Sequence, residues 1–486
     1  MTMKQYLLAF LLALPTVCLF TACGGGDDKM SEEIDEHLPK PDDPPMVDDW
    51  TITEIDATDF YSNGLKYSSR YGDYLTVIGI DKDHFKGKAH IASHLEYRGV
   101  GYDVTCFAQV AFDRDKELTE LTIPATVTSW ILGPATEKEW RATHFGNTLS
   151  SIVVDENNPT WDSRDNCNAI IETASNKLLF GCKNTVIPNT VKSIRTFAFA
   201  NCQMSSLFIP ASVREIEERA FDSYDLLSSI VVDEGNPSYD SRNACDAIIE
   251  KYTDKLLYGC KNTLIPNTVR SIASEAFIYC RALKSITIPA SVQSIEENAF
   301  YFCDNLTEVT IRSKSLVESN KTQHTSFADN FGQQVFTYIL PDDVKAIGDY
   351  TFWGCGVRGE MGDLEGIDIP NSVTRIGKWA FRRCSLKSFN MPSSLTEIDE
   401  YAFAENDFTE ITIPNGVSDI GSNAFLTCRN LRSIYCKNPY PCSCSGSAFD
   451  SDTYNNATLY VPKGAAENYK KAIYTGWAYF KNIVEY

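Results

Sequence analysis

The sequence predicts a solenoid of the mainly β or α/β type, built from about 14 short turns with a parallel sheet on one face. Three observations support this prediction. Segment 283–303 (LKSITIPASVQSIEENAFYFC) places apolar residues in the frame L-x-x-I-x-I-P-x-x-V-x-x-I-x-x-x-A-F-x-x-C. The same frame returns in 204–221, 364–381, 386–403 and 408–425. Most turns begin about 22 residues after the previous one, a period at which each turn buries its apolar face only against its neighbours.

The first strand residue of each turn can be placed on this frame. These residues are Leu118, Leu149, Cys182, Met204, Leu227, Cys260, Leu283, Leu306, Val335, Leu364, Leu386, Phe408, Leu431 and Asn456. No interval between them is long enough for an inserted domain. We therefore expect a continuous solenoid over residues 104–455.

Each turn of the frame has a physical logic. In the strand I-x-I, side chains alternate between the core and the solvent. The proline ends the strand because it has no N–H to donate. The alanine is small because backbone is expected to cross closely at that point, and the phenylalanine fills the core.

Both ends of the solenoid core are expected to be covered by caps. Residues 50–103 contain short alternating segments bounded by turn residues, which predict β-hairpins. Residues 456–486 should begin with a strand around Leu459 and Val461 and continue as a helix. The predicted helix has one apolar stripe, formed by Tyr469, Ala472, Ile473, Trp477, Phe480 and Ile483.

Two of the longest turns form a near-duplicate pair. Segment 150–199 aligns without gaps on 228–277, at an offset of 78 residues (from Ser150 to Ser228). In each copy, the sequences AIIETASNKLLFG and AIIEKYTDKLLYG predict a hairpin carried on the turn. We interpret the similarity as duplication of a structural unit rather than of an active site.

The N-terminal segment 1–22 has the pattern of an export signal, with Lys4 followed by an apolar run that is too short to span a bilayer stably. It ends in Leu19-Phe20-Thr21-Ala22-Cys23, which resembles the lipobox of bacterial lipoproteins, although Phe20 replaces the usual aliphatic residue. The resemblance implies lipidation at Cys23; an ordinary cleaved signal peptide is the alternative. Segment 23–49 is acidic and rich in proline, so it reads as an extended spacer.

Composition argues against several classes of function. The chain has 44 Lys+Arg against 65 Asp+Glu and a formal net charge of −21, which disfavours nucleic acid because such binding depends on basic side chains. Neither a phosphate-binding loop nor an H-E-x-x-H motif occurs. No cysteine of the repeat has an obvious histidine partner, so we expect neither an enzyme nor a cofactor.

No metal site is predicted either. His90 and His94 have helical ligand spacing, but their surroundings read as strand. The acidic loops 155–166 and 233–246 offer oxygen ligands, so calcium is an alternative, but neither has the EF-hand spacing. Solvated loops organised by Asn-Pro turn chemistry are the preferred interpretation.

The chain contains sixteen cysteines, and most fall in register with the repeat. Six lie three residues after the phenylalanine of Ala-Phe, and three more fill strand positions, where a small buried thiol suits the core. The alternative is disulfide formation between adjacent turns, as Cys280–Cys303 and Cys355–Cys384. Cys442 and Cys444 could also pair. The positions in register are Cys202, Cys280, Cys303, Cys355, Cys384, Cys428, Cys182, Cys260 and Cys436.

The repeat frame resembles that of bacterial surface leucine-rich repeats of the BspA type, over almost the whole chain after the export signal. Members of that family are associated with adhesion to host or matrix proteins and to other bacteria. The resemblance therefore implies a recognition protein that binds an extracellular protein. The Gly24–Asp28 segment resembles the acidic tag of lipoproteins at the outer face of the outer membrane. The alternatives are glycan or peptide capture for a nutrient-uptake system, and a passive surface-layer component.

The outward position five of the strand frame predicts where a partner binds. Five successive turns place apolar residues there, and an exposed apolar row often marks an interaction site. The alternative is that β-branched residues simply favour a sheet surface. The predicted row is Val153, Val186, Phe208, Val231 and Leu264.

Overall fold

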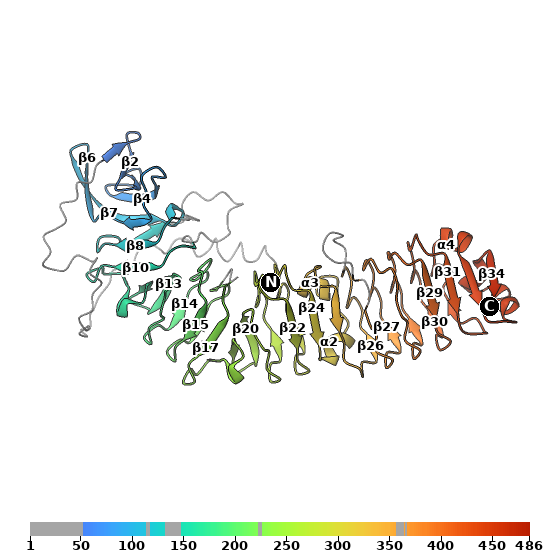
Figure 1. The fold of residues 1–486 in the computed structure, drawn as a ribbon. Coiled ribbons are helices and arrows are strands. Elements are labelled where there is room, and N and C mark those ends of the chain that lie inside the picture. Colours follow the sequence, from blue (N-terminus) through green and yellow to red (C-terminus); the bar gives the residue numbers. More distant parts are fainter. Residues whose placement is uncertain (1–51, 113–116, 132–146, 222–225, 356–363, 365–366) are drawn as a thin grey trace. The chain divides into compact units, whose positions relative to one another are not determined.

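A computed structural model describes residues 52–112, 117–131, 147–221, 226–355, 364 and 367–486. Its elements are labelled in Figure 1, and its contacts divide the chain into two compact units. One holds the described residues up to Cys202 together with Ile216–Ala220, and the other holds Gln203–Glu215 and the chain from Phe221 onward. The predicted export signal, Cys23 and the spacer lie outside the described residues. In the part of the chain that is described, no helix has both the length and the apolar character needed to cross a bilayer.

The first unit begins with a β-rich segment. Strands β1 to β4 pair in sequence as an antiparallel meander, and β6 and β7 form a further antiparallel pair. A parallel contact between β4 and β7 joins the two parts. The elements are β1 (Ile52–Glu54), β2 (Asp59–Ser62), β3 (Leu65–Ser68), β4 (Leu75–Ile80), β5 (Lys88–His90), β6 (His94–Tyr97), β7 (Val100–Ala108) and η1 (Gln109–Phe112).

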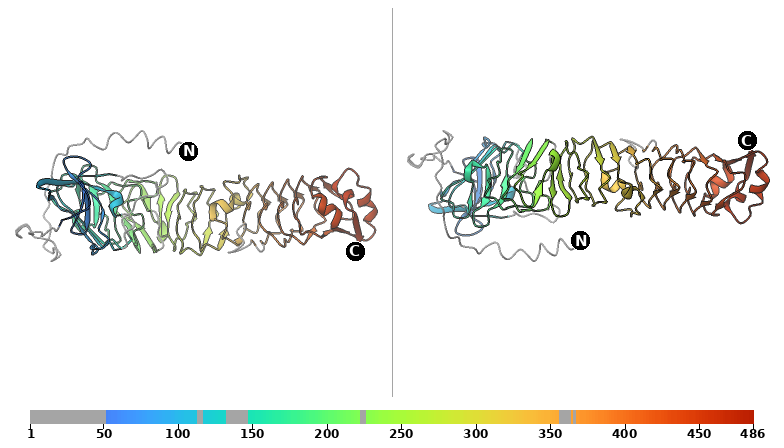
Figure 2. Two further views of the ribbon diagram at one scale, coloured as in Figure 1. Left: turned by 90° about the horizontal axis from the view of Figure 1, so that it is seen from above. Right: turned by 90° about the horizontal axis from the view of Figure 1, so that it is seen from below.

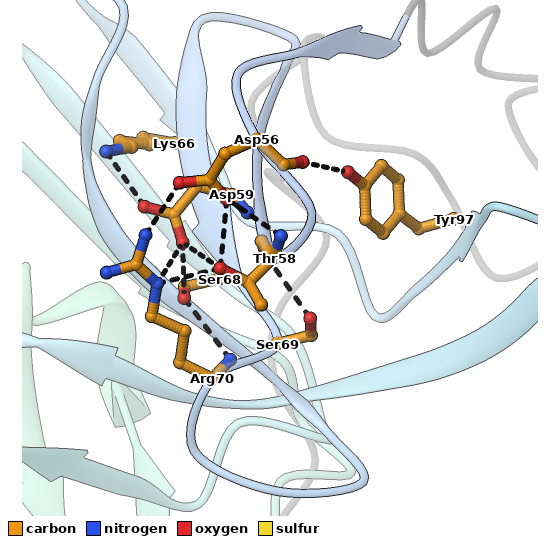
Figure 3. A network of polar contacts seen from close by, with 8 residues as sticks. All are labelled: Asp56, Thr58, Asp59, Lys66, Ser68, Ser69, Arg70 and Tyr97. Atoms are coloured by element: carbon orange, nitrogen blue, oxygen red, sulfur yellow. Dashed lines mark hydrogen bonds and ion pairs between the residues drawn. The ribbon is translucent and has the colours of Figure 1, made fainter.

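A polar network fixes the turn between β1 and β2 (Figure 3). The Asp56 carboxylate accepts the N–H groups of Thr58 and Asp59, both at 2.8 Å, and a guanidinium N–H of Arg70 at 2.7 Å. The hydroxyl of Tyr97 donates to the Asp56 carbonyl at 2.7 Å. The hydrogen bonds from the two backbone N–H groups hold the pKa of Asp56 well below its usual range. The network joins the first turn of the meander to β6.

The rest of the first unit is the start of the solenoid. Strands β5, β8 and β10 form a parallel sheet, and the predicted hairpin is present as β12 and β13. The elements are β8 (Glu120–Ile123), β9 (Ser129–Ile131), β10 (Ser151–Val154), β11 (Trp161–Asp162), η2 (Arg164–Asn166), β12 (Ala169–Glu172), β13 (Lys177–Gly181) and β14 (Ser193–Ile194); β16 (Glu215–Ile216) spans the boundary between the units.

The second unit is a stack of turns with short parallel strands, visible as successive rungs in Figure 2. Its first hairpin, β19 and β20, has the register of the β12–β13 hairpin, bulge included. The elements through α3 are β15 (Ser206–Ile209), β17 (Ser229–Val232), β18 (Tyr239–Asp240), η3 (Arg242–Ala244), β19 (Ala247–Glu250), β20 (Lys255–Gly259), β21 (Ser271–Ile272), β22 (Ser285–Ile288), β23 (Ser294–Ile295), β24 (Glu308–Ile311), α2 (Lys314–Glu318) and α3 (Phe327–Phe331).

Later turns repeat the pattern up to the C-terminal segment. Strands β29, β31, β33 and β34 form one parallel sheet, and β26, β27, β28, β30 and β32 form another. The elements are β25 (Thr337–Ile339), β26 (Ala346–Ile347), β27 (Arg375–Ile376), β28 (Glu397–Ile398), β29 (Glu410–Ile413), β30 (Asp419–Ile420), β31 (Ser433–Cys436), β32 (Ser443–Cys444), α4 (Ser451–Asn456), β33 (Thr458–Val461), α5 (Ala466–Lys470), η4 (Gly476–Tyr479) and β34 (Asn482–Glu485).

The Ala-Phe pair lies where the frame predicts, with the alanine at a close contact between the backbones of adjacent turns and the phenylalanine in the core. The Phe381 N–H donates to the Ala402 carbonyl of the next turn at 2.8 Å, and Phe403 donates to Ala424 in the same way. The buried rings stack along the core: the Phe381 and Phe403 ring centroids are 5.4 Å apart, at an interplanar angle of 5°. A side chain larger than alanine would separate the two backbones that this hydrogen bond joins.

The cysteine position three residues after the phenylalanine is not purely apolar, which corrects the sequence-based interpretation. The Cys303 thiol donates to the Phe277 carbonyl of the preceding turn at 3.1 Å, and Cys384 donates to Phe352 at 3.0 Å. In the next turn Asn406 takes this position. The position therefore selects a small side chain that carries a hydrogen-bond donor. No disulfide joins any of the fourteen cysteines that the structure describes.

The C-terminal segment differs from the predicted strand followed by one helix. After β33 come the five-residue α5, the short η4 and a final strand, β34, which pairs in parallel with β33. Tyr469, Trp477 and Phe480 are buried as predicted, but Ile473 is 62% exposed. The helical stripe is wrong because the backbone turns at residues 471–475, so side chains that a helix would align point in different directions.

Candidate binding face

The best-defined part of the predicted row is the pair Phe208 and Val231. Strands β15 and β17 pair in parallel, with Phe208 opposite Val231 and Ser206 opposite Ser229. Phe208 is 50% exposed and Val231 is 46% exposed, whereas their neighbours Leu207 and Ile230 are buried. The alternation of β-strand side chains therefore places two large apolar groups side by side in solvent.

Leu264 and Val186 are even more exposed, at 76% and 70%, but neither lies on a strand. This corrects the prediction that both occupy position five of a strand. In each case threonine replaces the isoleucine of position four. The buried Thr263 hydroxyl accepts the Cys260 N–H and donates to the Asp246 carbonyl, both at 2.7 Å.

The same arrangement recurs at Thr185 in the first unit. Its hydroxyl accepts the Cys182 N–H and donates to the Asn168 carbonyl, again at 2.7 Å. These hydrogen bonds hold a tight turn in place of a strand and leave the next residue, Val186, in solvent. We call 183–186 (KNTV) and 261–264 (KNTL) the KNT turns.

Val153, the first residue of the predicted row, is only half-buried rather than fully exposed. It lies on β10, opposite Thr122 of β8. The five predicted residues are divided between the units, with Val153 and Val186 in the first and Phe208, Val231 and Leu264 in the second. The clearest candidate site is therefore the group in the second unit.

The outward positions of the strands around this group carry no carboxylate, but the half-buried Asp246 lies beside them and its carboxylate accepts the Ile230 N–H at 3.2 Å. Strands β15, β17 and β22 present only hydroxyl or apolar side chains at positions three and five, and the first acidic residue on this face is Glu308 of β24. Lys261 and Lys284 lie at position two of their turns. Among the described residues, neither ammonium group has an ion-pair partner. In a chain of net charge −21, this patch thus holds two lysines, Lys261 and Lys284, and one aspartate, Asp246.

Aromatic residues gather elsewhere, two positions before the core phenylalanine of three turns. Tyr350, Trp379 and Tyr401 all have positive φ, and their rings stack in order, with Tyr350–Trp379 centroids 5.6 Å apart and Trp379–Tyr401 centroids 4.3 Å apart. The Arg382 guanidinium lies 4.2 Å from the Trp379 centroid. Because neighbouring rings cover both faces of Trp379, this stack stabilises the turns and offers no free tryptophan face to a sugar.

The geometry gives no support to a metal or catalytic centre in the described part of the chain. His90 Nδ1 lies 3.1 Å from the Thr122 hydroxyl, and His94 Nδ1 lies 3.0 Å from Asp103, so the two rings have separate partners. No group of three potential metal ligands occurs among the described residues. Burial raises the pKa of the Cys303 thiol far above its ordinary value, which removes its nucleophilic form at neutral pH.

The acidic loops are organised by Asn-Pro turn chemistry. The buried Asn236 donates to the Pro210 and Val213 carbonyls, both at 2.9 Å, and accepts the N–H groups of Ser238 and Tyr239. Asn158 makes the equivalent contacts in the first copy. The asparagine amide therefore holds each loop to the preceding turn.

The sequence matches the BspA type leucine rich repeat region in six copies, over residues 169–245, 247–358 and 359–474. These residues make up well over half of the 486-residue chain. Among curated proteins, no match is found.

Several solved structures resemble the chain at low sequence identity. A leucine-rich repeat protein from Bacteroides ovatus is 19% identical, covers 89% of this chain and 99% of its own, and has a TM-score of 0.38. One from Eubacterium ventriosum is 19% identical, covers 77% and 94%, and has a TM-score of 0.38. The pneumococcal vaccine antigen PcpA is 14% identical, covers 90% and 98%, and has a TM-score of 0.32. With scores this low, the repeat match alone carries the family assignment.

Proposed function

Because this chain belongs to the BspA type of leucine-rich repeat proteins, we propose that it is a recognition and adhesion protein of the cell surface, which binds an extracellular protein through its repeat face. The proposed partner is a host, matrix or bacterial surface protein. The proposed site is centred on Phe208 and Leu264, with Val231 between them in the sequence of turns. Val153 and Val186 are proposed as further binding residues, in the first unit.

One observation carries this proposal. Phe208 and Val231 stand in register on adjacent strands, and both are about half exposed, in a chain whose surface is otherwise rich in acid. Aromatic side chains at the centre of an interface contribute strongly to binding, because they bury a large area at low entropic cost. Hydroxyl side chains around such a centre suit the polar rim of a protein interface.

The proposal is tested with the full-length protein in detergent, captured on a surface and exposed to host matrix proteins and to other bacteria. The double change Phe208→Ser and Leu264→Ser should weaken the partner that binds by at least tenfold. Its melting temperature should stay within about 2 °C of wild type, because both side chains are exposed. A matched control is Tyr252→Ser with Ile473→Ser, two exposed apolar residues away from the face.

Unchanged binding by the Phe208 and Leu264 variant would refute this site. Binding to a glycan array in place of proteins would support capture of glycan for nutrient uptake. Absence of binding to every protein and glycan would favour a passive surface-layer role.

We also propose that the chain is anchored to the outer membrane by lipid at Cys23, facing outward, and that it uses neither enzyme activity nor a cofactor. The lipobox-like segment supports the anchor. Changing Cys23 to Ala should move the protein from the detergent phase to the soluble fraction. A variant that still partitions into detergent, or a wild type without lipid, would contradict the anchor.

A further inference from the structure

The two KNT turns carry the same pair of side chains, a lysine that is exposed in the first turn and half-buried in the second, and an exposed aliphatic residue. In the second unit, Lys261 is followed three residues later by Leu264, and in the first unit Lys183 is followed in the same way by Val186. Leu264 and Val186 are among the most exposed aliphatic side chains of the described chain, at 76% and 70%. The buried threonine between them anchors each turn, so both side chains project from a fixed backbone.

Within the described residues, the lysine side chains of these turns, Lys183 and Lys261, form no ion pair with an acidic side chain of the protein, although acidic residues outnumber basic ones in the chain. Other lysines near the hairpins do form one, such as Lys255, whose ammonium lies 2.7 Å from Glu296. The difference is local: acidic side chains face the lysines of the hairpins, whereas the outward positions beside Lys261 carry serine, asparagine and threonine, and the carboxylate of the nearby Asp246 accepts the Ile230 N–H.

We infer that each KNT turn binds an extended protein segment in which an acidic side chain lies close to an aliphatic one. The carboxylate meets the lysine, and the aliphatic group packs on Leu264 or Val186. This inference rests on the proposed function and names the chemistry of the partner. It follows from charge complementarity, because these turns combine uncommitted ammonium groups with apolar surface in an acidic protein.

The two KNT turns lie in different units, so each is a separate site for one such segment. Binding should weaken with salt, since exposed charges are screened.

The experiment uses the full-length protein and three fluorescein-labelled twelve-residue peptides of alternating residues: Asp with Leu, Asn with Leu, and Lys with Leu. Fluorescence anisotropy at low salt should show the Asp–Leu peptide binding at least tenfold tighter than the other two. The double change Lys183→Glu and Lys261→Glu should invert the order, so that the Lys–Leu peptide binds best.

The matched control is Lys192→Glu with Arg270→Glu. These two exposed residues are also related by the duplication, and their reversal changes net charge by the same amount, but they precede β14 and β21 and lie outside the KNT turns. The control should keep the preference of the wild type. Inversion by the control as well would show that net charge alone sets the preference, and would overturn the inference.

Two further outcomes separate this inference from the proposed function. If Phe208→Ser with Leu264→Ser weakens the extracellular partner while the lysine reversal changes no peptide preference, the proposed face stands and the acidic partner is overturned. If a heparin oligosaccharide binds as tightly as the Asp–Leu peptide, and Leu264→Ser changes the affinity for neither, then binding depends on negative charge alone. The inference again fails in that case.

Discussion

Replacing Asn406 tests whether the position after each phenylalanine is a hydrogen-bonding site between turns. Asn406 is 2% exposed. Its amide N–H groups donate to the carbonyls of Phe381 and Phe403, both at 2.8 Å, and its oxygen accepts the N–H groups of Cys384 at 3.2 Å and Leu386 at 3.0 Å. One side chain thus satisfies backbone groups of two successive turns.

The change Asn406→Ala removes all of these partners at once. Two buried N–H groups and the Phe381 carbonyl lose their hydrogen bonds, and each such group costs about 1–3 kcal/mol. We therefore expect the free energy of unfolding to fall by about 3–9 kcal/mol if the space stays dry, and by less where water enters it. Asn406→Cys provides a matched comparison, because cysteine occupies the same position in neighbouring turns. It keeps a donor to Phe381 but lacks the acceptor, so we expect roughly half of that loss.

Native-state hydrogen exchange is a suitable assay, because a stack of turns need not unfold in one step. Exchange at Cys384 and Leu386 should accelerate strongly in Asn406→Ala, and less in Asn406→Cys. Urea unfolding should give the same order. If Asn406→Ala lowers the free energy of unfolding by less than about 0.5 kcal/mol, the backbone groups have other partners and the reasoning is wrong.

The remaining predictions concern thiols and pH. Cys303→Ser should lower the free energy of unfolding by less than about 1 kcal/mol, because the hydroxyl still donates a hydrogen bond to the Phe277 carbonyl. Cys303→Ala should lower it by more. If thermal denaturation shows Cys303→Ala to be the more stable variant, the hydrogen-bonding role is contradicted. Ellman's reagent should react with few thiols in the native protein at pH 8, since burial raises the pKa of Cys245 and Cys442 to about 11. In guanidinium without reductant, it should react with most of the fourteen described thiols. If few thiols react in guanidinium, the cysteines form disulfides. Hydrogen bonds hold the folded-state pKa of Asp56 below the ordinary 3.8, so its stabilisation is present above pH 3.8 and is lost as pH falls below it. Asp56→Asn should therefore destabilise the first unit at pH 6 and destabilise it less at pH 2, where the unfolded chain is already protonated at this residue; an equal effect at both pH values would argue against an ionised Asp56.

The frame of each turn was predictable from the sequence because it depends on contacts that every turn repeats. A strand alternates its side chains, so Ile230 and Leu207 had to be buried if Val231 and Phe208 were exposed, and the structure confirms this. The stacked phenylalanines follow in the same way, since an apolar ring that recurs at one position must meet its copy in the next turn. The near-duplicate hairpins were also predictable, because they repeat the same local pattern.

Other features depend on groups that no local pattern contains. Thr263 disrupts the strand at Leu264 because its hydroxyl finds the Cys260 N–H and the Asp246 carbonyl, and that carbonyl lies on a different part of the turn. Cys303 and Asn406 act as donors only because a carbonyl of the preceding turn lies within reach. The C-terminal segment became a final strand rather than one helix because β33 offered an edge for pairing. The sequence by itself determined the period and the buried side of each strand; the tertiary structure decided the interturn hydrogen bonds, because their acceptors lie more than twenty residues away along the chain.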